Sequence, residues 1–366
     1  MHRIGIAAFT ERGKALAAQI GGQLAGTKEN GGEAQAACEI LWYEKNLKSW
    51  CAECFERADG IIFIGACGIA VRTIAPFLKS KTSDPAVLVI DEMGQFVISL
   101  LSGHIGGANE FALDVASCIG AAPVITTASD VNGKIAVDVF AKKNHLAIGS
   151  MAAAKKIAAA ILRGEDVGVY CTGEIEGNIP AELRLLNQKA AGSSWKQPAG
   201  KADHILWISE AAPSSRELEQ YLKSPEGTVL HLIPRTVVLG IGCRKNKAAE
   251  EIFDGISKVL EQERIPVRAL KLAASIDLKK EEPGILALCR RYGIDFMTYP
   301  APELAQVQGD FQPSEFVKRT TGVDNVCERA ALLAAGKDAK LIRKKYAENG
   351  VTAALAVQKW RVRFEE

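Results

Sequence analysis

Residues 86–119 read AVLVIDEMGQFVISLLSGHIGGANEFALDVASCI, and this stretch decides the fold class. Two short apolar runs, at residues 87–90 and 96–98, have the length and composition of buried strands. A glycine-rich turn follows them, and residues 106–119 then carry apolar side chains at helical spacing. Strands that alternate with helices in this way are typical of βαβ units. The stretch therefore predicts an α/β fold with mainly parallel sheets.

The same alternation continues in both directions and predicts several domains in the 366 residues. Strands are expected at residues 4–8, 61–65, 167–171, 204–208, 228–233, 236–241, 295–299 and 352–357. Helices are expected at residues 12–24, 151–162, 246–262, 280–292 and 324–335. Residues 188–203 are turn-rich and predict a loop, and Pro234 separates two strands. We therefore expect an N-terminal α/β domain at 1–147, a middle domain at 148–233 and a C-terminal α/β domain at 234–366.

Composition excludes several classes of protein. The chain has 45 Lys and Arg against 43 Asp and Glu, a balance that argues against a nucleic-acid partner. Its longest apolar run, residues 61–71, is too short to span a membrane, which needs about 20 residues. The first residues lack the apolar core of a signal peptide. The nine cysteines show no regular spacing, and the close pair Cys51 and Cys54 is expected on a helix rather than in a zinc site. These features predict a cytoplasmic protein.

Glycines and polar residues gather where the expected strands end. Such glycines allow backbone N–H groups to approach an anion at a helix N-terminus. Neither glycine cluster matches a dinucleotide fingerprint or a P-loop, so the sequence does not support a nucleotide. The candidate substrate-binding residues in this region are Gly68, Arg72, Lys79, Lys81, Gly103, Gly106, Gly107, Asn109, Thr126 and Thr127.

His104 is the strongest catalytic candidate. It lies in the turn before the expected 106–119 helix, whose positive end would hold the imidazole neutral and able to act as a base. Backbone amides of this turn, with Ser102 or Asn109, would stabilise an oxyanion, and Asp84 or Asp130 would orient the ring. The alternative is that His104 only caps the helix.

A second group of candidates opens the last domain in the run GIGCRK at residues 240–245. Gly240 and Gly242 are expected to form a tight turn from strand to helix, with Arg244 directed toward an anion. Cys243 is either a nucleophile or a small buried residue; we favour the second because no partner histidine is visible. Further candidates for substrate binding are Lys279 and Glu282, for which solvated charges at a helix start are the alternative.

Together these motifs resemble one family, the cobalamin-biosynthesis protein CbiG. The resemblance rests on GIAVR at 68–72, APFLKSK at 75–81, DPAV at 84–87, LLSGHIGGAN at 100–109 and TTASD at 126–130. The start of the C-terminal domain at 240–244, Lys279 with Glu282 and Gly284, Ser314 and Thr352 are also similar to that family. No motif in residues 140–230 adds to the resemblance, although the length of this region suits the family's variable middle domain.

The resemblance implies the reaction of cobalt-precorrin-5A hydrolase in anaerobic cobalamin biosynthesis. That family opens a δ-lactone and releases acetaldehyde, giving cobalt-precorrin-5B. The substrate would be a polycarboxylate tetrapyrrole that carries its own cobalt, so no cofactor and no protein-bound metal are expected. Two alternatives remain: a non-catalytic carrier of corrinoid intermediates and a sugar-phosphate or nucleotide-binding α/β enzyme. Contacts with other enzymes of the pathway and the oligomeric state are left open.

Overall fold

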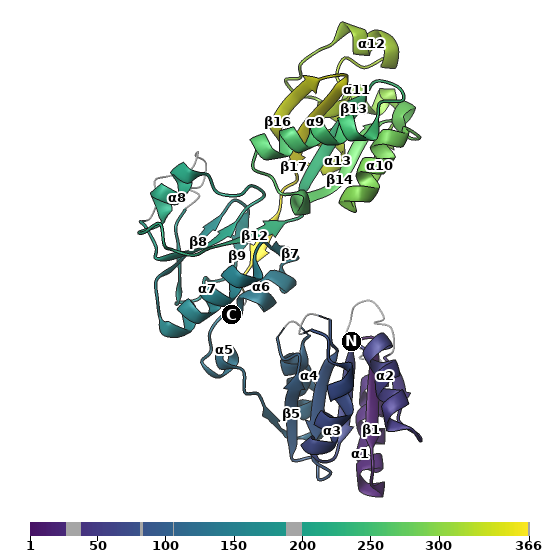
Figure 1. Ribbon diagram of the computed structural model, residues 1–366, viewed down its shortest axis with the longest axis vertical. Helices are drawn as coiled ribbons and strands as arrows, with labels where there is room; N and C mark the ends of the chain where they lie inside the picture. Colours follow the sequence, from purple (N-terminus) through teal and green to yellow (C-terminus); the bar gives the residue numbers. More distant parts are fainter. Residues whose placement is uncertain (27–37, 81–82, 105, 188–199, 365–366) are drawn as a thin grey trace. The chain divides into compact units, whose positions relative to one another are not determined.

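The structure of the protein is a computed structural model that describes residues 1–26, 38–80, 83–104, 106–187 and 200–364. The chain forms two compact units, Met1–Val139 and Phe140–Glu366. Both are α/β, and most strand pairs within their main sheets are parallel (Figure 1). The α/β fold with several parallel-rich sheets is confirmed. The greater part of the loop expected at 188–203 lies outside the described residues.

The first unit is a six-stranded sheet with the order β2-β1-β3-β4-β5-β6. Its strands are β1 (Arg3–Ala8), β2 (Glu39–Trp42), β3 (Gly60–Ile64), β4 (Ala86–Ile90), β5 (Phe96–Leu101) and β6 (Ala122–Val124). Side chains of α1 (Glu11–Ala25) and α4 (Ala108–Ile119) cover one face of this sheet. Side chains of α2 (Leu47–Arg57) and α3 (Cys67–Ile74) pack on the other. The unit thus has two apolar layers around one sheet.

The direction of β5 determines where the candidate site lies. β5 runs antiparallel to β4, with Leu101 opposite Val87, while β6 is parallel to β5. The carboxyl ends of β5 and β6 therefore lie at the edge of the sheet where β3 and β4 begin. The loop that carries His104 leaves the sheet at this edge, and the loops that follow β1 and β3 leave it at the opposite edge.

The second unit begins with a five-stranded sheet of order β10-β8-β11-β12-β7. Its strands are β7 (Leu146–Ile148), β8 (Val167–Cys171), β10 (Leu183–Leu185), β11 (His204–Ile208) and β12 (Val229–Pro234). Its helices are α7 (Met151–Arg163) and α8 (Ser215–Tyr221). Our expected boundary at residues 147 and 148 falls within β7, which pairs with β12 of this sheet. The division into three domains stays a proposal.

The other sheet of the second unit has the order β15-β14-β13-β17-β16. Its strands are β13 (Val237–Cys243), β14 (Leu270–Ile276), β15 (Asp295–Tyr299), β16 (Lys340–Glu348) and β17 (Val351–Val357). Side chains of α9 (Ala249–Gln262) and α10 (Pro283–Tyr292) pack on one face, and those of α13 (Cys327–Ala335) pack on the other. A last strand, β18 (Arg361–Arg363), returns to pair with β9 (Glu174–Glu176).

The expected turn at Gly240 and Gly242 is wrong, because both glycines lie within β13. A Cβ atom at Gly240 would be 1.8 Å from the carbonyl oxygen of Cys327 in α13. A Cβ atom at Gly242 would be 2.7 Å from Thr352 Oγ1 in β17. These glycines therefore allow close packing of a helix and a strand against β13, and the strand continues to Cys243.

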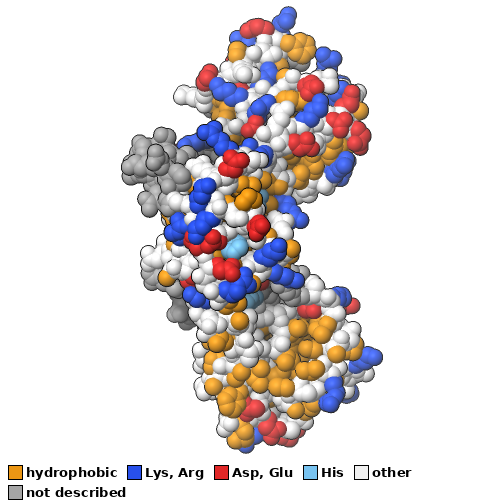
Figure 2. All heavy atoms as spheres, turned by 60° about the vertical axis from the view of Figure 1, so that its left-hand side comes forward, with side chains coloured by type: hydrophobic (Ala, Val, Ile, Leu, Met, Phe, Trp, Pro, Cys, Tyr) orange, Lys and Arg blue, Asp and Glu red, His pale blue; other side chains and the backbone are white. Residues whose placement is uncertain are grey.

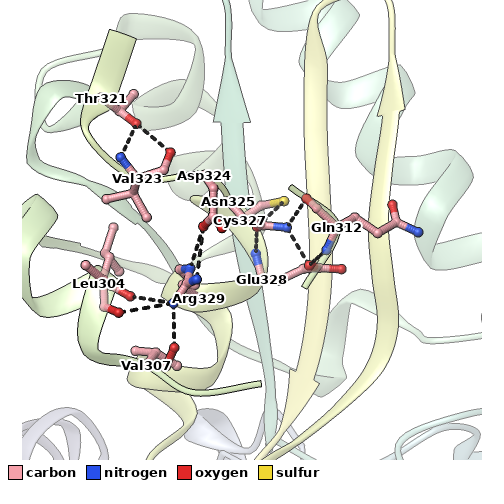
Figure 3. A network of polar contacts seen from close by, with 11 residues as sticks. Leu304, Val307, Gln312, Thr321, Val323, Asp324, Asn325, Cys327, Glu328 and Arg329 are labelled. Atoms are coloured by element: carbon pink, nitrogen blue, oxygen red, sulfur yellow. Dashed lines mark hydrogen bonds and ion pairs between the residues drawn. The ribbon is translucent and has the colours of Figure 1, made fainter. Parts of the chain in front are cut away.

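A buried polar network fixes the segment between α11 (Ala301–Gln306) and α13, which includes α12 (Glu315–Thr321) (Figure 3). Glu328 is fully buried, and its carboxylate accepts the backbone N–H groups of Gln312 and Lys345 as well as the amide of Asn325. Arg329 donates to Asp324 at 3.0 Å and to backbone carbonyls of residues 304, 305 and 307. Such satisfied polar groups hold this connection in a defined conformation beside its apolar contacts.

No helix in the described part of the chain is long and apolar enough to cross a membrane.

Candidate active site

The His104 loop closes on itself. Ser102 adopts a left-handed backbone conformation with φ 59°, and Gly107 does so with φ 83°. The N–H groups of Gly107, Ala108 and Asn109 donate to the carbonyls of His104, Ser102 and Gly103, respectively, at 2.9–3.1 Å. These three amides are therefore already used within the protein. The amide of Gly107 belongs to the turn that we expected to stabilise an oxyanion, and its donor is not free for that role. The helix begins at Ala108 rather than at residue 106.

The glycines of this loop are required by packing. A Cβ atom at Gly103 would be 2.7 Å from Asn109 Oδ1, and one at Gly106 would be 2.3 Å from the Ser102 Cβ atom. Contacts this short do not occur for real side chains, so the loop can form only with glycine at both positions. The structure thus assigns them a conformational role next to His104.

The His104 ring lies between two carboxylates. Its Nε2 atom is 2.9 Å from Asp130 Oδ2 and 2.8 Å from the Ser129 hydroxyl. Its Nδ1 atom is 3.6 Å from Asp138 Oδ1. Asp130 and Ser129 belong to α5 (Ala128–Val131), and Asp138 belongs to α6 (Val137–Lys143). The side chain of His104 keeps 22 % of its surface exposed, so a bound molecule can reach it.

These contacts reverse our expectation of a neutral imidazole. Asp138 raises the pKa of His104, and Asp130 raises it further, although partial burial of the ring opposes them. The two carboxylates, 2.9 and 3.6 Å from the ring nitrogens, act in the opposite direction to the positive end of α4. Both carboxylates therefore favour the protonated form of His104, in which each ring nitrogen carries an N–H donor.

This pKa shift predicts a dependence of stability on pH. A His whose pKa is raised on folding stabilises the protein fully below its unfolded pKa of about 6.5, and this stability is lost as the pH rises through the folded pKa. Urea unfolding of the wild type and of His104→Asn, compared at about pH 6 and pH 8.5, should show the larger difference in unfolding free energy at the lower pH. A difference that grows with pH would contradict the ion pairs described above.

Asn109 lies in a buried hydrogen-bond network that includes Asp130, the partner of His104. Its Oδ1 atom accepts the Ser99 hydroxyl at 2.7 Å, and its Nδ2 atom donates to Asp130 Oδ2 and to Thr127 Oγ1, both at 3.0 Å. Asn109 is 5 % exposed. The expected role of Asn109 in stabilising an oxyanion therefore does not fit its position. Its Nδ2 group already donates hydrogen bonds to Asp130 and Thr127. Thr126 beside them is exposed.

Asp84 serves a neighbouring loop at the same edge of the sheet. Its carboxylate accepts the backbone N–H groups of Lys79 and Ser80 at 3.1–3.2 Å, and its carbonyl accepts the Ser102 hydroxyl at 3.0 Å. This placement favours Asp130 over Asp84 as the group that orients the imidazole. Asp84 thereby links the segment of the exposed Lys79 to the loop that carries Ser102. Lys81 lies outside the described residues.

Two predicted binding residues of the first unit lie elsewhere. Gly68 is in the first turn of α3, which begins after the carboxyl end of β3. A Cβ atom at Gly68 would be 3.4 Å from Arg72 Nη1, so this guanidinium points back toward the start of the helix. Because the His104 loop leaves the opposite edge of the sheet, the structure does not bring Gly68 and Arg72 together with His104.

The remaining predicted residues form a group of their own in the second unit. Glu282, which is 6 % exposed, pairs with Lys279 at 2.7 Å and accepts the backbone N–H of Asn246 at 2.7 Å. Arg244 donates its backbone N–H to the carbonyl of Gly350. Lys279 and Glu282 are thus a buried ion pair that holds the turn after β13, rather than solvated charges at a helix start. Gly242, within β13, is the fourth predicted residue of this group.

Cys243, Cys51 and Cys54 are poor nucleophiles in this fold. Burial raises the pKa of Cys243 to about 11, that of Cys51 to about 11 and that of Cys54 to about 12. The pair Cys51 and Cys54 lies in α2, as expected. Thiols with such pKa values stay protonated near neutral pH and neither attack carbonyl groups nor bind metals readily.

We therefore expect the variant Cys243→Ser to keep most of the wild-type turnover. The measurement is the steady-state rate together with a thermal unfolding curve, which shows that the variant is folded. Mass spectrometry of the wild type after mixing with substrate is the complementary experiment. A thioester trapped on Cys243 would refute the prediction.

Sequence reasoning missed Asp138, Ser129 and Ser99. Asp138 lies 34 positions from His104 in the chain, and nothing in the local pattern links the two. The only signal was the clustering of small polar residues at 126–130 after the expected 106–119 helix. Among the described residues, no group of three or more His, Cys, Asp or Glu side chains is placed to hold a metal ion.

Comparisons with known proteins cover most of the chain. Residues 49–130 match the family description "Cobalamin synthesis G N-terminal", residues 135–234 match "Cobalamin biosynthesis central region", and residues 237–356 match "Cobalamin synthesis G C-terminus". These ranges include His104, Asp130 and Asp138.

Two relatives bear the name cobalt-precorrin-5A hydrolase. The protein from Priestia megaterium is 35 % identical over 323 residues, which cover 86 % of this chain and 83 % of the relative. The protein from Salmonella typhimurium is 37 % identical over 309 residues, covering 83 % and 84 %. A solved cobalamin biosynthesis protein G homolog from Sulfolobus solfataricus is 23 % identical, with a TM-score of 0.38 over 98 % of this chain and 97 % of that one.

Proposed function

This chain belongs to the CbiG family, and from that premise we propose that it is a cobalt-precorrin-5A hydrolase whose chemistry takes place at His104. The reaction opens the δ-lactone of cobalt-precorrin-5A and releases acetaldehyde, giving cobalt-precorrin-5B. The relatives that bear this name align over more than four fifths of the chain. The observation that carries the placement of the site is the position of the His104 ring, which has Asp130 2.9 Å from Nε2 and Asp138 3.6 Å from Nδ1.

An imidazolium suits the first step of this reaction. Water adds to the lactone carbonyl, and the acyl–oxygen bond then breaks, which leaves a carboxylate and an alkoxide. Protonation of the departing alkoxide by a positioned acid lowers the barrier. His104 can give this proton because Asp138 and Asp130 raise its pKa and direct its N–H groups.

The second step needs the reverse transfer. The new hydroxyl group must lose its proton as the carbon–carbon bond breaks, and its oxygen becomes the carbonyl oxygen of acetaldehyde. The electron pair of the broken bond passes to the conjugated macrocycle, which takes up a proton from solvent. The imidazole that became neutral in the first step can accept this proton, which restores the imidazolium. One histidine thus acts first as an acid and then as a base, and Asp130 keeps the ring in place.

Recognition of the substrate requires apolar surface and cations. A tetrapyrrole has a flat apolar ring with carboxylates around its rim. The first unit exposes large apolar side chains, which gather on one of its faces (Figure 2). Val71, Leu78 and Phe96 are each 47 % exposed, and the first two precede Arg72 and Lys79 in the chain. We assign Arg72 and Lys79 to carboxylates of the substrate, each at its own edge of the sheet.

The test is to incubate the wild-type protein with cobalt-precorrin-5A and to follow both products. Hydrolysis gives one acetaldehyde for each macrocycle consumed, detected through an aldehyde reductase and NADH. Binding without acetaldehyde would refute the hydrolase and would fit a carrier of corrinoid intermediates. The assay is run without added metal salts, because we propose that the only metal needed is the cobalt in the substrate.

A further inference from the structure

Asp138 differs from the other contacts of His104 in its place along the chain. It lies in the first turn of α6, two residues before Phe140, and the first compact unit ends between them at Val139. α6 is therefore the segment in which one unit ends and the next begins. The group that contacts Nδ1 of His104 is carried by this connection.

The carboxylate of Asp138 has a defined orientation. Its Oδ1 atom accepts the backbone N–H of Val139 at 3.0 Å and is also the atom nearest to His104 Nδ1. The side chain of Asp138 is 16 % exposed, less than that of Asp130 at 40 %. The charged groups that act on the ring in the described structure are Asp138 from α6 and Asp130 from α5.

The helix that carries Asp138 cannot hold its shape alone. α6 has seven residues, and helices of this length are unstable in water without tertiary contacts. Its contacts are supplied by the last residues of the chain. The Phe140 ring stacks on Phe364 with 4.6 Å between centroids, and both side chains are buried.

Asn144, just after α6, adds a second anchor. Its Oδ1 atom accepts the backbone N–H of Arg363 at 2.6 Å, and its Nδ2 atom donates to the Arg363 carbonyl at 3.0 Å. The side-chain amide of Asn144 thus makes the two backbone hydrogen bonds with β18 that a residue of a neighbouring strand would make. β18 is itself fixed by pairing with β9 and by ion pairs from Arg361 and Arg363 to Glu176.

We propose that Asp138 is a positioning residue for His104, and that α6 ties its carboxylate to the last strand of the chain. This inference rests on the proposed function of His104. The contacts of Phe140 with Phe364 and of Asn144 with Arg363 of β18 hold α6 in place, and α6 positions the Asp138 carboxylate. The C-terminal strand, more than 220 residues after Asp138, thereby supports the histidine site.

The experiment measures the His104 titration directly by NMR of the full-length protein with isotope-labelled histidine. The chain has five histidines, and the signal of His104 is identified by its loss in His104→Asn. Asp138→Asn should lower the pKa of His104, while Asp138→Glu, which keeps the charge, should restore most of the shift. Asp114→Asn is the matched control, because Asp114 is an exposed acid on α4.

The anchor is tested with Asn144→Ala, which leaves Phe140 and Phe364 in place so that the unit stays folded. We expect this variant to shift the His104 pKa in the same direction as Asp138→Asn and to slow acetaldehyde release by about two- to thirtyfold. Asp138→Asn should slow it by at least about tenfold.

Each part of the inference can fail separately. An unchanged His104 pKa in Asp138→Asn overturns the role of Asp138, and an unchanged pKa in Asn144→Ala overturns the link through α6. If the wild type releases no acetaldehyde, the proposed function fails, but the titration still decides whether Asp138 and α6 act on His104.

Discussion

Replacement of His104 by Ala is expected to lower the turnover of cobalt-precorrin-5A by about 10²–10⁴-fold. The variant loses the group that gives a proton to the departing alkoxide and takes one back during carbon–carbon cleavage. Binding of the substrate should weaken far less, because the apolar face, Arg72 and Lys79, which we assign to recognition of the macrocycle, are untouched. The measurement is kcat for acetaldehyde release at saturating substrate, with the dissociation constant determined separately.

The control for this prediction is His104→Asn. An amide can still donate a hydrogen bond toward Asp130 and keep the loop closed, but it cannot transfer a proton. We expect His104→Asn to be as slow as His104→Ala while recovering part of the stability that His104→Ala loses. Acetaldehyde release near the wild-type rate in His104→Asn would show that the histidine only caps α4 or fills its loop.

The largest effect on stability is expected for Gly240→Ala. The added methyl group would lie 1.8 Å from the Cys327 carbonyl oxygen and 2.8 Å from the Ala331 side chain. Both belong to α13, which packs directly on β13, so the helix must move away from the sheet. Overpacking against backbone usually costs 1–3 kcal/mol, and we expect about 3 kcal/mol or more here. Urea unfolding of the second unit measures this loss.

Gly255→Ala provides the matched control in the same unit. Gly255 lies inside α9, and a Cβ atom there would meet only Val351 side-chain atoms at 3.4 Å or more. Alanine is the better helix former by roughly 0.5–1 kcal/mol. We therefore expect Gly255→Ala to leave stability unchanged or slightly higher. Equal losses in the two variants would contradict the close packing of α13 on β13.

Much of the fold follows from local sequence pattern. The apolar runs that became β3, β4, β8 and β13 are buried and central in their sheets, where composition is most informative. Short or half-exposed elements such as β2, β9 and β18 were missed because they depend on pairing with distant strands. The role of Gly240 was also missed, since only the approach of α13 reveals why glycine is required there.

The direction of β5 was not predicted from the sequence, and it determines where the site lies. Only residues 91–95 join β4 to β5, and a connection this short allows an antiparallel pair but no parallel crossover. The length of this connection therefore indicates, from the sequence alone, that His104 and Gly68 lie at opposite edges of the sheet. The contacts of His104 with Asp130 and Asp138 could not be predicted from the sequence. They join residues 26 and 34 positions apart, and they depend on loop conformations that the hydrophobic pattern does not indicate.

We propose that this chain hydrolyses cobalt-precorrin-5A by addition of water to the lactone carbonyl. A single turnover in H₂¹⁸O with excess protein, followed by mass spectrometry of the macrocycle and an assay of acetaldehyde, tests this reaction directly. We expect one ¹⁸O atom in the newly formed carboxylate and one acetaldehyde per macrocycle. A product whose carboxylates carry no label, or substrate that stays bound and intact, would contradict it.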